Sequence, residues 1–371
     1  MRLRSLLPIL TLVGFIVGTE ADAQLLYAGG EDIDFLCNSG GGCVSSLGGA
    51  FRTGWARTAY MVAGSSTDPA TNRFATPTFS PNSALWIHAQ FCNTATNNLA
   101  NGCGSVGVGT TANAQMLRIL DSSGNPTLIV RGTGNPQQVK ISSRTAAGVF
   151  TDLVTCSSAF NLSLTQLDLY INYGTSGEVT LYNNSAQVCD YTGNVTNGDG
   201  ATTLNQVEFG GLISVGYGAW SEVIIAGSDT RAMARFTANT VGNGNTTGFS
   251  GTNVCSAIWS AVSFNDTSYG FSGSTNVLHE CTINSSIPAG SYNVLALVMS
   301  ARALVGSSGP LHLDFVTRIG GTDYTSSDFA PTTSFSNIAN YIQTVNPASS
   351  SPWIVSDFQA TGFNVGEKTK P

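Results

Sequence analysis

Apolar and polar residues alternate with a period of two through residues 164–193, the spacing of a β-strand that buries one face. The apolar set of the first predicted strand is Leu167, Leu169, Ile171 and Tyr173, and the opposite set is Asp168, Tyr170 and Asn172. Val179 and Leu181 repeat the pattern after a turn over Thr175–Gly177. The segment therefore predicts a β-hairpin with one buried face and one face in water.

Other strand-length patterns recur at short intervals, with turn residues between them. These predicted strands cover residues 115–120, 127–131, 138–142, 149–155, 205–209 and 220–225. Residues 292–299 are apolar at successive positions, which predicts a central strand covered on both sides. Leu311, Leu313 and Phe315 alternate with His312, Asp314 and Val316 in a further strand. Helical spacing is confined to one short candidate, residues 336–345.

Closely spaced strands without helical crossovers indicate an all-β protein with antiparallel sheets. The length of the chain suits two β-sandwich domains of the jelly-roll type. We place the first domain at residues 24–230 and the second at 231–371. The boundary precedes a stretch rich in Gly, Asn and Thr at residues 239–253.

The first residues have the pattern of a secretory leader. Arg2 and Arg4 precede an apolar run over residues 6–18, and Ala21 and Ala23 stand where a signal peptidase cuts. We expect a signal peptide over residues 1–23, with an uncleaved N-terminal anchor as the alternative. Elsewhere the chain lacks the roughly 20 consecutive apolar residues that a spanning helix needs. The prediction is an extracellular or virion-surface protein without membrane insertion after cleavage.

Eight cysteines follow this leader, an even number that favours disulfides in an oxidising compartment. No C-x-x-C motif occurs and the histidines at 88, 279 and 312 are scattered, so a zinc site is not expected. Short separations favour sequential pairing among the connectivities that eight cysteines allow. The expected pairs are Cys37–Cys43, Cys92–Cys103, Cys156–Cys189 and Cys255–Cys281.

Charge excludes some partners. Charged residues make up 10% of the chain, against roughly 25% in a typical domain, and the net charge is −7. This balance argues against nucleic acid and against anionic membranes as partners.

Several longer segments resemble a known family. They are GGEDIDF (29–35), FRTGWARTAY (51–60), WSEVIIAGSDTRAM (220–233) and NPASSSPWIVSDF (346–358). Together with the hairpin they resemble the concanavalin A-like jelly rolls, of the laminin-G or pentraxin kind, in tail or virion-surface proteins of tailed bacteriophages. The resemblance implies a β-sandwich that displays a surface to glycans or to sister subunits, as a homo-oligomer.

The resemblance leaves two alternatives to a structural or adhesive protein: a freestanding secreted carbohydrate-binding lectin and a glycoside hydrolase. Glucanases of this superfamily need two carboxylates on one face of a strand. Glu31 and Asp34 come nearest to that pattern, but a spacing of three directs them to opposite faces of a strand. We therefore predict a protein that is not an enzyme.

Ligand-binding candidates are few. Loop oxygens offer a weak calcium site at Asp32, Asp34, Asp199 and Asp229, and no other cofactor is expected. Trp55, between Arg52 and Arg57, is the candidate for an exposed contact with a ligand. Trp86 and Trp220 lie within predicted strands and are expected in the core. His88 is expected to be a structural histidine.

Overall fold

The protein is described here from a computed structural model, in which residues 12–18, 24–30, 34–37, 44–47, 59–64, 73–94, 112–135, 138–157, 165–211, 217–238, 240–251, 254–257, 269–283 and 292–371 are placed. The chain divides into two compact units. The larger unit comprises Asp22–Thr53 and Thr58–Ala234, and the smaller unit comprises Met1–Ala21, Gly54–Arg57 and Arg235–Pro371. The described strand pairs are antiparallel, which confirms the all-β sandwich class.

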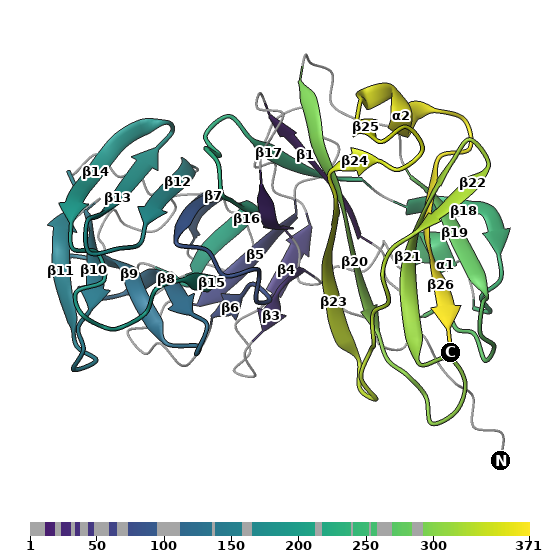
Figure 1. Cartoon of the computed structure of the whole chain (residues 1–371), viewed down its shortest axis with the longest axis horizontal. Helices are drawn as coiled ribbons and strands as arrows, with labels where there is room; N and C mark the ends of the chain where they lie inside the picture. The colour runs from purple at the N-terminus through teal and green to yellow at the C-terminus, as the bar shows by residue number, and fades with distance from the viewer. Residues whose placement is uncertain are drawn as a thin grey trace. The chain divides into compact units, whose positions relative to one another are not determined.

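The larger unit contains an eight-stranded and a seven-stranded sheet (Figure 1). The eight-stranded sheet runs β14-β13-β12-β7-β16-β5-β4, and β2 also pairs with β16. Its strands are β2 (Leu25–Gly29), β4 (Val44–Leu47), β5 (Ala59–Gly64), β7 (Ala84–Thr94), β12 (Thr165–Asn172), β13 (Gly177–Asn183), β14 (Ala186–Gly193) and β16 (Tyr217–Ala226).

The seven-stranded sheet runs β11-β10-β9-β8-β15-β6-β3. Its strands are β3 (Leu36–Cys37), β6 (Phe74–Ala75), β8 (Gln115–Asp121), β9 (Pro126–Gly132), β10 (Val139–Arg144), β11 (Phe150–Thr155) and β15 (Leu204–Phe209). A single hydrophobic cluster contains the inward residues of both sheets. Leu167, Leu169 and Ile171 belong to it, as the alternation in β12 predicts, and so does the fully buried Trp220.

The smaller unit is also built of antiparallel sheets. One sheet runs β17-β1-β20-β23, with β1 (Leu12–Gly18), β17 (Ala234–Ala238), β20 (Asn293–Ala303) and β23 (Ser336–Gln343). The other runs β18-β19-β26-β21-β22, with β18 (Thr240–Thr247), β19 (Leu278–Ile283), β21 (His312–Ile319), β22 (Thr322–Thr325) and β26 (Asn364–Lys370). The shorter elements are α1 (Val254–Ala257), α2 (Val355–Gln359), β24 (Val345–Asn346) and β25 (Ser351–Pro352).

These two sheets pack face to face through aromatic residues. Phe315 of β21 stacks on Tyr341 of β23, with ring centroids 5.8 Å apart. Residues 294–299 of β20 are at most 8% exposed, so this strand is central, as its apolar sequence predicts.

The predicted helix over residues 336–345 is wrong, because most of this segment forms strand β23. Ile338 and Tyr341 are three residues apart, a helical spacing, yet they pair with Ala301 and Met299, which lie two apart on one face. A bulge at Asn340, whose φ is 68°, takes up the extra residue. A bulged strand therefore reproduces the spacing of a helix in the sequence.

Two of the expected disulfides lie among the described residues. Cys156 and Cys189 are bonded across 33 residues, and Cys255 and Cys281 across 26 residues. Cys92 is also disulfide-bonded. Cys43, Cys103 and the side chain of Cys37 lie outside the described part of the chain.

The segment expected as a leader contributes a strand. Leu12–Gly18 forms β1, between β17 and β20 in the smaller unit. Among the described helices, none is long and apolar enough to cross a membrane.

Candidate functional site

Three aromatic side chains lie together on the outer face of the eight-stranded sheet. Trp86 of β7 is directly opposite Tyr170 of β12, with ring centroids 5.0 Å apart. Tyr182 of β13 stacks on Trp86 at 5.8 Å and an interplanar angle of 20°. All three side chains are partly exposed. We call Trp86, Tyr170 and Tyr182 the aromatic platform.

The position of Trp86 corrects the expectation that it lies in the core. Leu85 and Ile87 are 0% and 2% exposed because they face the hydrophobic cluster between the two sheets. The alternation of β7 then directs Trp86 outward, on the side of His88.

Arg231 lies over this platform. Its guanidinium carbon is 4.6 Å from the ring centroid of Tyr182 and 5.3 Å from that of Trp86. Asp229 accepts hydrogen bonds from Arg231 Nε at 3.0 Å and from a terminal nitrogen at 2.5 Å. The two-point contact fixes the plane of the guanidinium, and cation–π attraction holds it against the rings.

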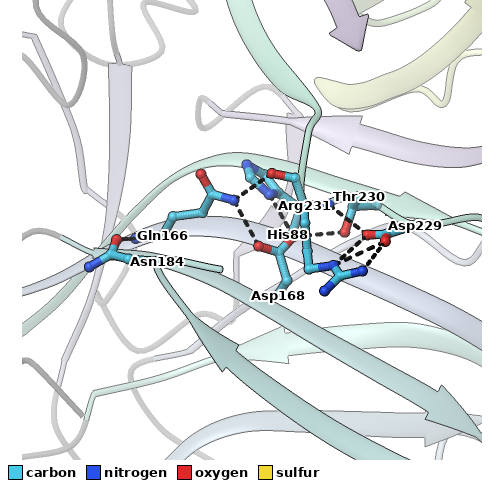
Figure 2. Close-up of polar contacts among 7 residues, drawn as sticks. All are labelled: His88, Gln166, Asp168, Asn184, Asp229, Thr230 and Arg231. Carbon is cyan, nitrogen blue, oxygen red and sulfur yellow. Dashed lines mark hydrogen bonds and ion pairs between the residues drawn. The ribbon is translucent and has the colours of Figure 1, made fainter. Parts of the chain in front are cut away.

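A buried polar network attaches the segment of Arg231 to the sheet (Figure 2). Asp168 accepts hydrogen bonds from His88 Nδ1 at 2.8 Å and from Thr230 Oγ1 at 2.8 Å. The amide of Gln166 donates to both Asp168 and the backbone oxygen of Arg231, each at 2.9 Å. Through these bonds the strands β7 and β12 set the position of Arg231.

The electrostatics of the network stabilise a buried carboxylate. Asp168 and His88 are both 0% exposed. Burial acts to raise the pKa of Asp168, but the facing His88 and the hydrogen bonds from Gln166 and Thr230 outweigh it, so the pKa is lowered. The polar face predicted for β12 is therefore not entirely in water, because residues 229–231 contact Asp168 and Gln166 there.

Acceptor groups border the platform on neighbouring strands. Thr180 pairs with Tyr170 in register, and its hydroxyl lies 3.0 Å from carboxylate oxygens of Glu178 and Asp190. Burial, and next the charge of Glu178, raise the pKa of Tyr170. Its phenol therefore stays protonated at neutral pH and can donate a hydrogen bond.

This arrangement is suited to binding a ring-shaped polar ligand. The platform offers partly exposed aromatic rings, two of them beneath Arg231, and its border offers carboxylate acceptors and the phenol of Tyr170. His88 is fully buried and bound to Asp168, so it supports the site from beneath rather than contacting a ligand.

The described residues of the expected calcium site each have a different partner. Asp34 is buried and accepts a hydrogen bond from the Gly30 amide at 2.9 Å. Asp199 accepts one from the Tyr173 hydroxyl at 2.7 Å, beside a polar pocket of about 420 Å³. Asp229 binds Arg231 instead. Several other candidates lie outside the described residues: Glu31, Asp32, Arg52, Trp55 and Arg57.

A calcium site stays a prediction. In the described part of the chain, one group of three metal-ligating side chains lies within 4.8 Å: Cys255, His279 and Cys281. Two of these side chains are joined in a disulfide, so that group does not present the free thiolates that metals bind.

The sequence matches no protein-family model and no curated protein. Among solved structures, the chain is similar to an endo-β-1,4-glucuronan lyase from the fungus Trichoderma reesei, with 10% identity, a TM-score of 0.38, and 58% of this chain and 98% of that one covered. The globular domain of T. cruzi calreticulin has 9% identity, a TM-score of 0.35, and coverages of 56% and 89%. An alginate lyase in complex with alginate trisaccharide has 12% identity, a TM-score of 0.29, and coverages of 57% and 97%.

These likenesses concern the sandwich fold and do not identify a ligand. They do contradict the prediction that the chain is not an enzyme, because polysaccharide lyases are among the structures that it resembles. The resemblance to tailed-bacteriophage proteins stays a prediction.

The aromatic platform was not predicted from the sequence as a site. Trp86 is far in the chain from the hairpin that contains Tyr170 and Tyr182, and each residue by itself is an ordinary strand aromatic. A usable signal was the face of β7 and β12: the alternation that sends Leu85 and Leu169 inward sends Trp86 and Tyr170 outward.

Proposed function

We propose that the aromatic platform binds a neutral glycan. The observation that carries this proposal is the grouping of Trp86, Tyr170 and Tyr182 on adjacent strands, partly exposed and with Arg231 over two of the rings. Sugar rings have apolar C–H faces that pack on such rings and hydroxyls that donate to carboxylates such as Glu178 and Asp190.

The charges near the platform favour a neutral over an acidic glycan. Asp229 already neutralises Arg231, and the carboxylates of Glu178 and Asp190 lie beside Thr180 on the same sheet without a described cationic partner of their own. The net charge of the chain is −7. A polyuronate would be repelled by this surface, whereas a neutral polysaccharide would not.

Glycan-array screening followed by calorimetry tests the proposal. We expect binding to a neutral β-glucan, mannan or galactan, and Trp86→Ala should weaken it about tenfold, the loss of about 1.4 kcal/mol of stacking. Tyr324→Ala, at a half-buried tyrosine of the smaller unit, is the matched control and should bind like wild type.

Tighter binding of alginate or glucuronan than of every neutral glycan would contradict the charge argument. Equal binding by wild type and by Trp86→Ala would show that the platform is not the site.

A further inference from the structure

Strand β1 occupies an inner position of its sheet, with β17 on one side and β20 on the other. It pairs with β20 from Leu12, opposite Ser300, to Gly18, opposite Asn293. Both backbone edges of β1 are therefore used in the sheet, as in any inner strand.

The described side chains of β1, from Phe15 onward, are covered on both faces. Phe15, Ile16 and Val17 are successive residues and are 0%, 0% and 5% exposed. Phe15 packs edge-on against Phe358 of α2, with ring centroids 4.4 Å apart. Successive side chains of a strand point to opposite faces, so this position requires an apolar segment on both sides.

The same residues carry the leader pattern, with Arg2 and Arg4 before them and Ala21 and Ala23 after them. Cleavage after Ala23 would remove β1 and leave β17 and β20 as two unpaired edges beside an apolar slot. Exposed strand edges of this kind bind further strands.

We infer that the smaller unit contains a strand-acceptor site, the slot between β17 and β20. The leader segment Leu12–Gly18 fills it in the full-length chain, and a segment of a partner chain fills it after the leader is removed. The partner segment is an extended stretch of about seven residues, uncharged and apolar on both faces, added by β-strand addition. This site lies in a different unit from the aromatic platform, and the inference does not rest on glycan binding.

The composition of β1 defines the partner further. Phe15 lies opposite Leu297 and Ile16 lies opposite Ala296, and both side chains are fully buried, so the slot takes an aromatic residue on one face and a branched aliphatic residue on the other. A segment apolar on both faces does not occur on the surface of a folded domain. The donor is therefore a terminal extension or another extended segment of the partner, rather than an edge strand of a sandwich.

The experiment begins with the exported protein. The chain is produced with its own leader and secreted, and its intact mass gives the first residue, which we expect to be Gln24. A synthetic peptide of residues 11–20, TLVGFIVGTE, is then titrated against this protein. Expected results are saturable one-to-one binding, a higher Tm, and slower hydrogen exchange at those β20 amides between residues 294 and 300 that point toward β1 rather than toward β23.

The matched control peptide carries Phe15→Asp and should bind at least tenfold more weakly. In the protein, Phe358→Ser should weaken binding of the wild-type peptide. It should leave glycan binding by the larger unit unchanged. If Phe358→Ser does not fold, the affinities of the two peptides for the wild-type protein are sufficient to test the strand-acceptor site.

Three results would overturn the inference: an exported chain that retains residues 12–18, equal binding of both peptides, or full protection, in a monomer without peptide, of the β20 amides that point toward β1. An exported chain that forms oligomers which the peptide dissociates would support it and would identify the donor as a second copy.

Discussion

At the scale of single residues, buried polar groups connect stability to the site. Asp168 and His88 form a pair that is closed to solvent, and the same carboxylate holds Thr230, next to Arg231. A charge buried among such partners is stabilising only while all of them are present.

Replacing the buried carboxylate should therefore destabilise the protein. Asp168→Asn should lower the free energy of unfolding by about 3 kcal/mol at pH 7, because it leaves His88 without its charged partner. Denaturant titration measures the loss. Asp190→Asn, at an exposed carboxylate of the same face, is the control and should change it by less than about 0.5 kcal/mol.

The pH dependence of this effect has a defined sign. The pKa of Asp168 is lowered by folding, so its contribution is complete above the unfolded pKa of about 3.9 and disappears as the pH falls through the folded value. The difference in free energy of unfolding between wild type and Asp168→Asn should therefore become smaller as the pH is lowered. A difference that stays constant down to pH 2 would contradict the prediction.

Glu367 behaves in the opposite way. It is 2% exposed in β26, and burial raises its pKa well above the ordinary value, so folding favours its protonated form. The loss of stability that the buried Glu367 carboxyl causes is absent below its unfolded pKa of about 4.3. This loss grows as the pH rises toward the pKa of Glu367 in the folded protein. Glu367→Gln should match wild type near pH 4 and be more stable at pH 7, as measured by thermal unfolding. The reverse order would show that the carboxylate has an ionised partner.

At the scale of elements, strand identity and facing followed from the sequence, and irregularities did not. The alternation in β12 and β13 predicted which residues are buried, because one face of the strand packs on the core. The residue spacing around the bulge in β23 predicts a helix, because local spacing cannot distinguish an inserted residue from a helical turn.

The backbone conformation of Asn340 in this bulge predicts which substitutions it tolerates. Asn340 has a φ of 68°, which β-branched side chains tolerate poorly. Asn340→Val should therefore destabilise the protein by about 1–2 kcal/mol, and Asn340→Gly should be close to neutral. Chemical denaturation of both variants tests this, and equal losses would argue against the left-handed conformation.

Each of the two described disulfides joins two elements of the same unit. Cys189 lies in β14, and Cys156 directly follows β11, so their bond joins strands from the two sheets of the larger unit. The double variant Cys156→Ala, Cys189→Ala should lose about 3–4 kcal/mol, the value that the entropy of a loop of this length predicts. A loss below about 1 kcal/mol would show that the unfolded chain is already compact.

At the scale of the whole molecule, the described residues of the proposed glycan site belong to one unit. Trp86, Tyr170, Tyr182 and Arg231 are all within the larger unit, which has its own core. A fragment of residues 24–234 should fold cooperatively and bind glycan with the affinity of the full chain. Calorimetry and circular dichroism test both expectations, and a folded fragment without affinity would show that the smaller unit contributes to the site.

The sequence by itself determined the fold class, the inward face of most strands and the pairing of the two described disulfides, Cys156–Cys189 and Cys255–Cys281. These properties depend on local periodicity and short separations, which are visible without a structure. The tertiary structure alone decided that Trp86, Tyr170, Tyr182 and Arg231 meet, and that Leu12–Gly18 fits between β17 and β20. Both depend on strand order and register between segments far apart in the chain, which no local pattern encodes.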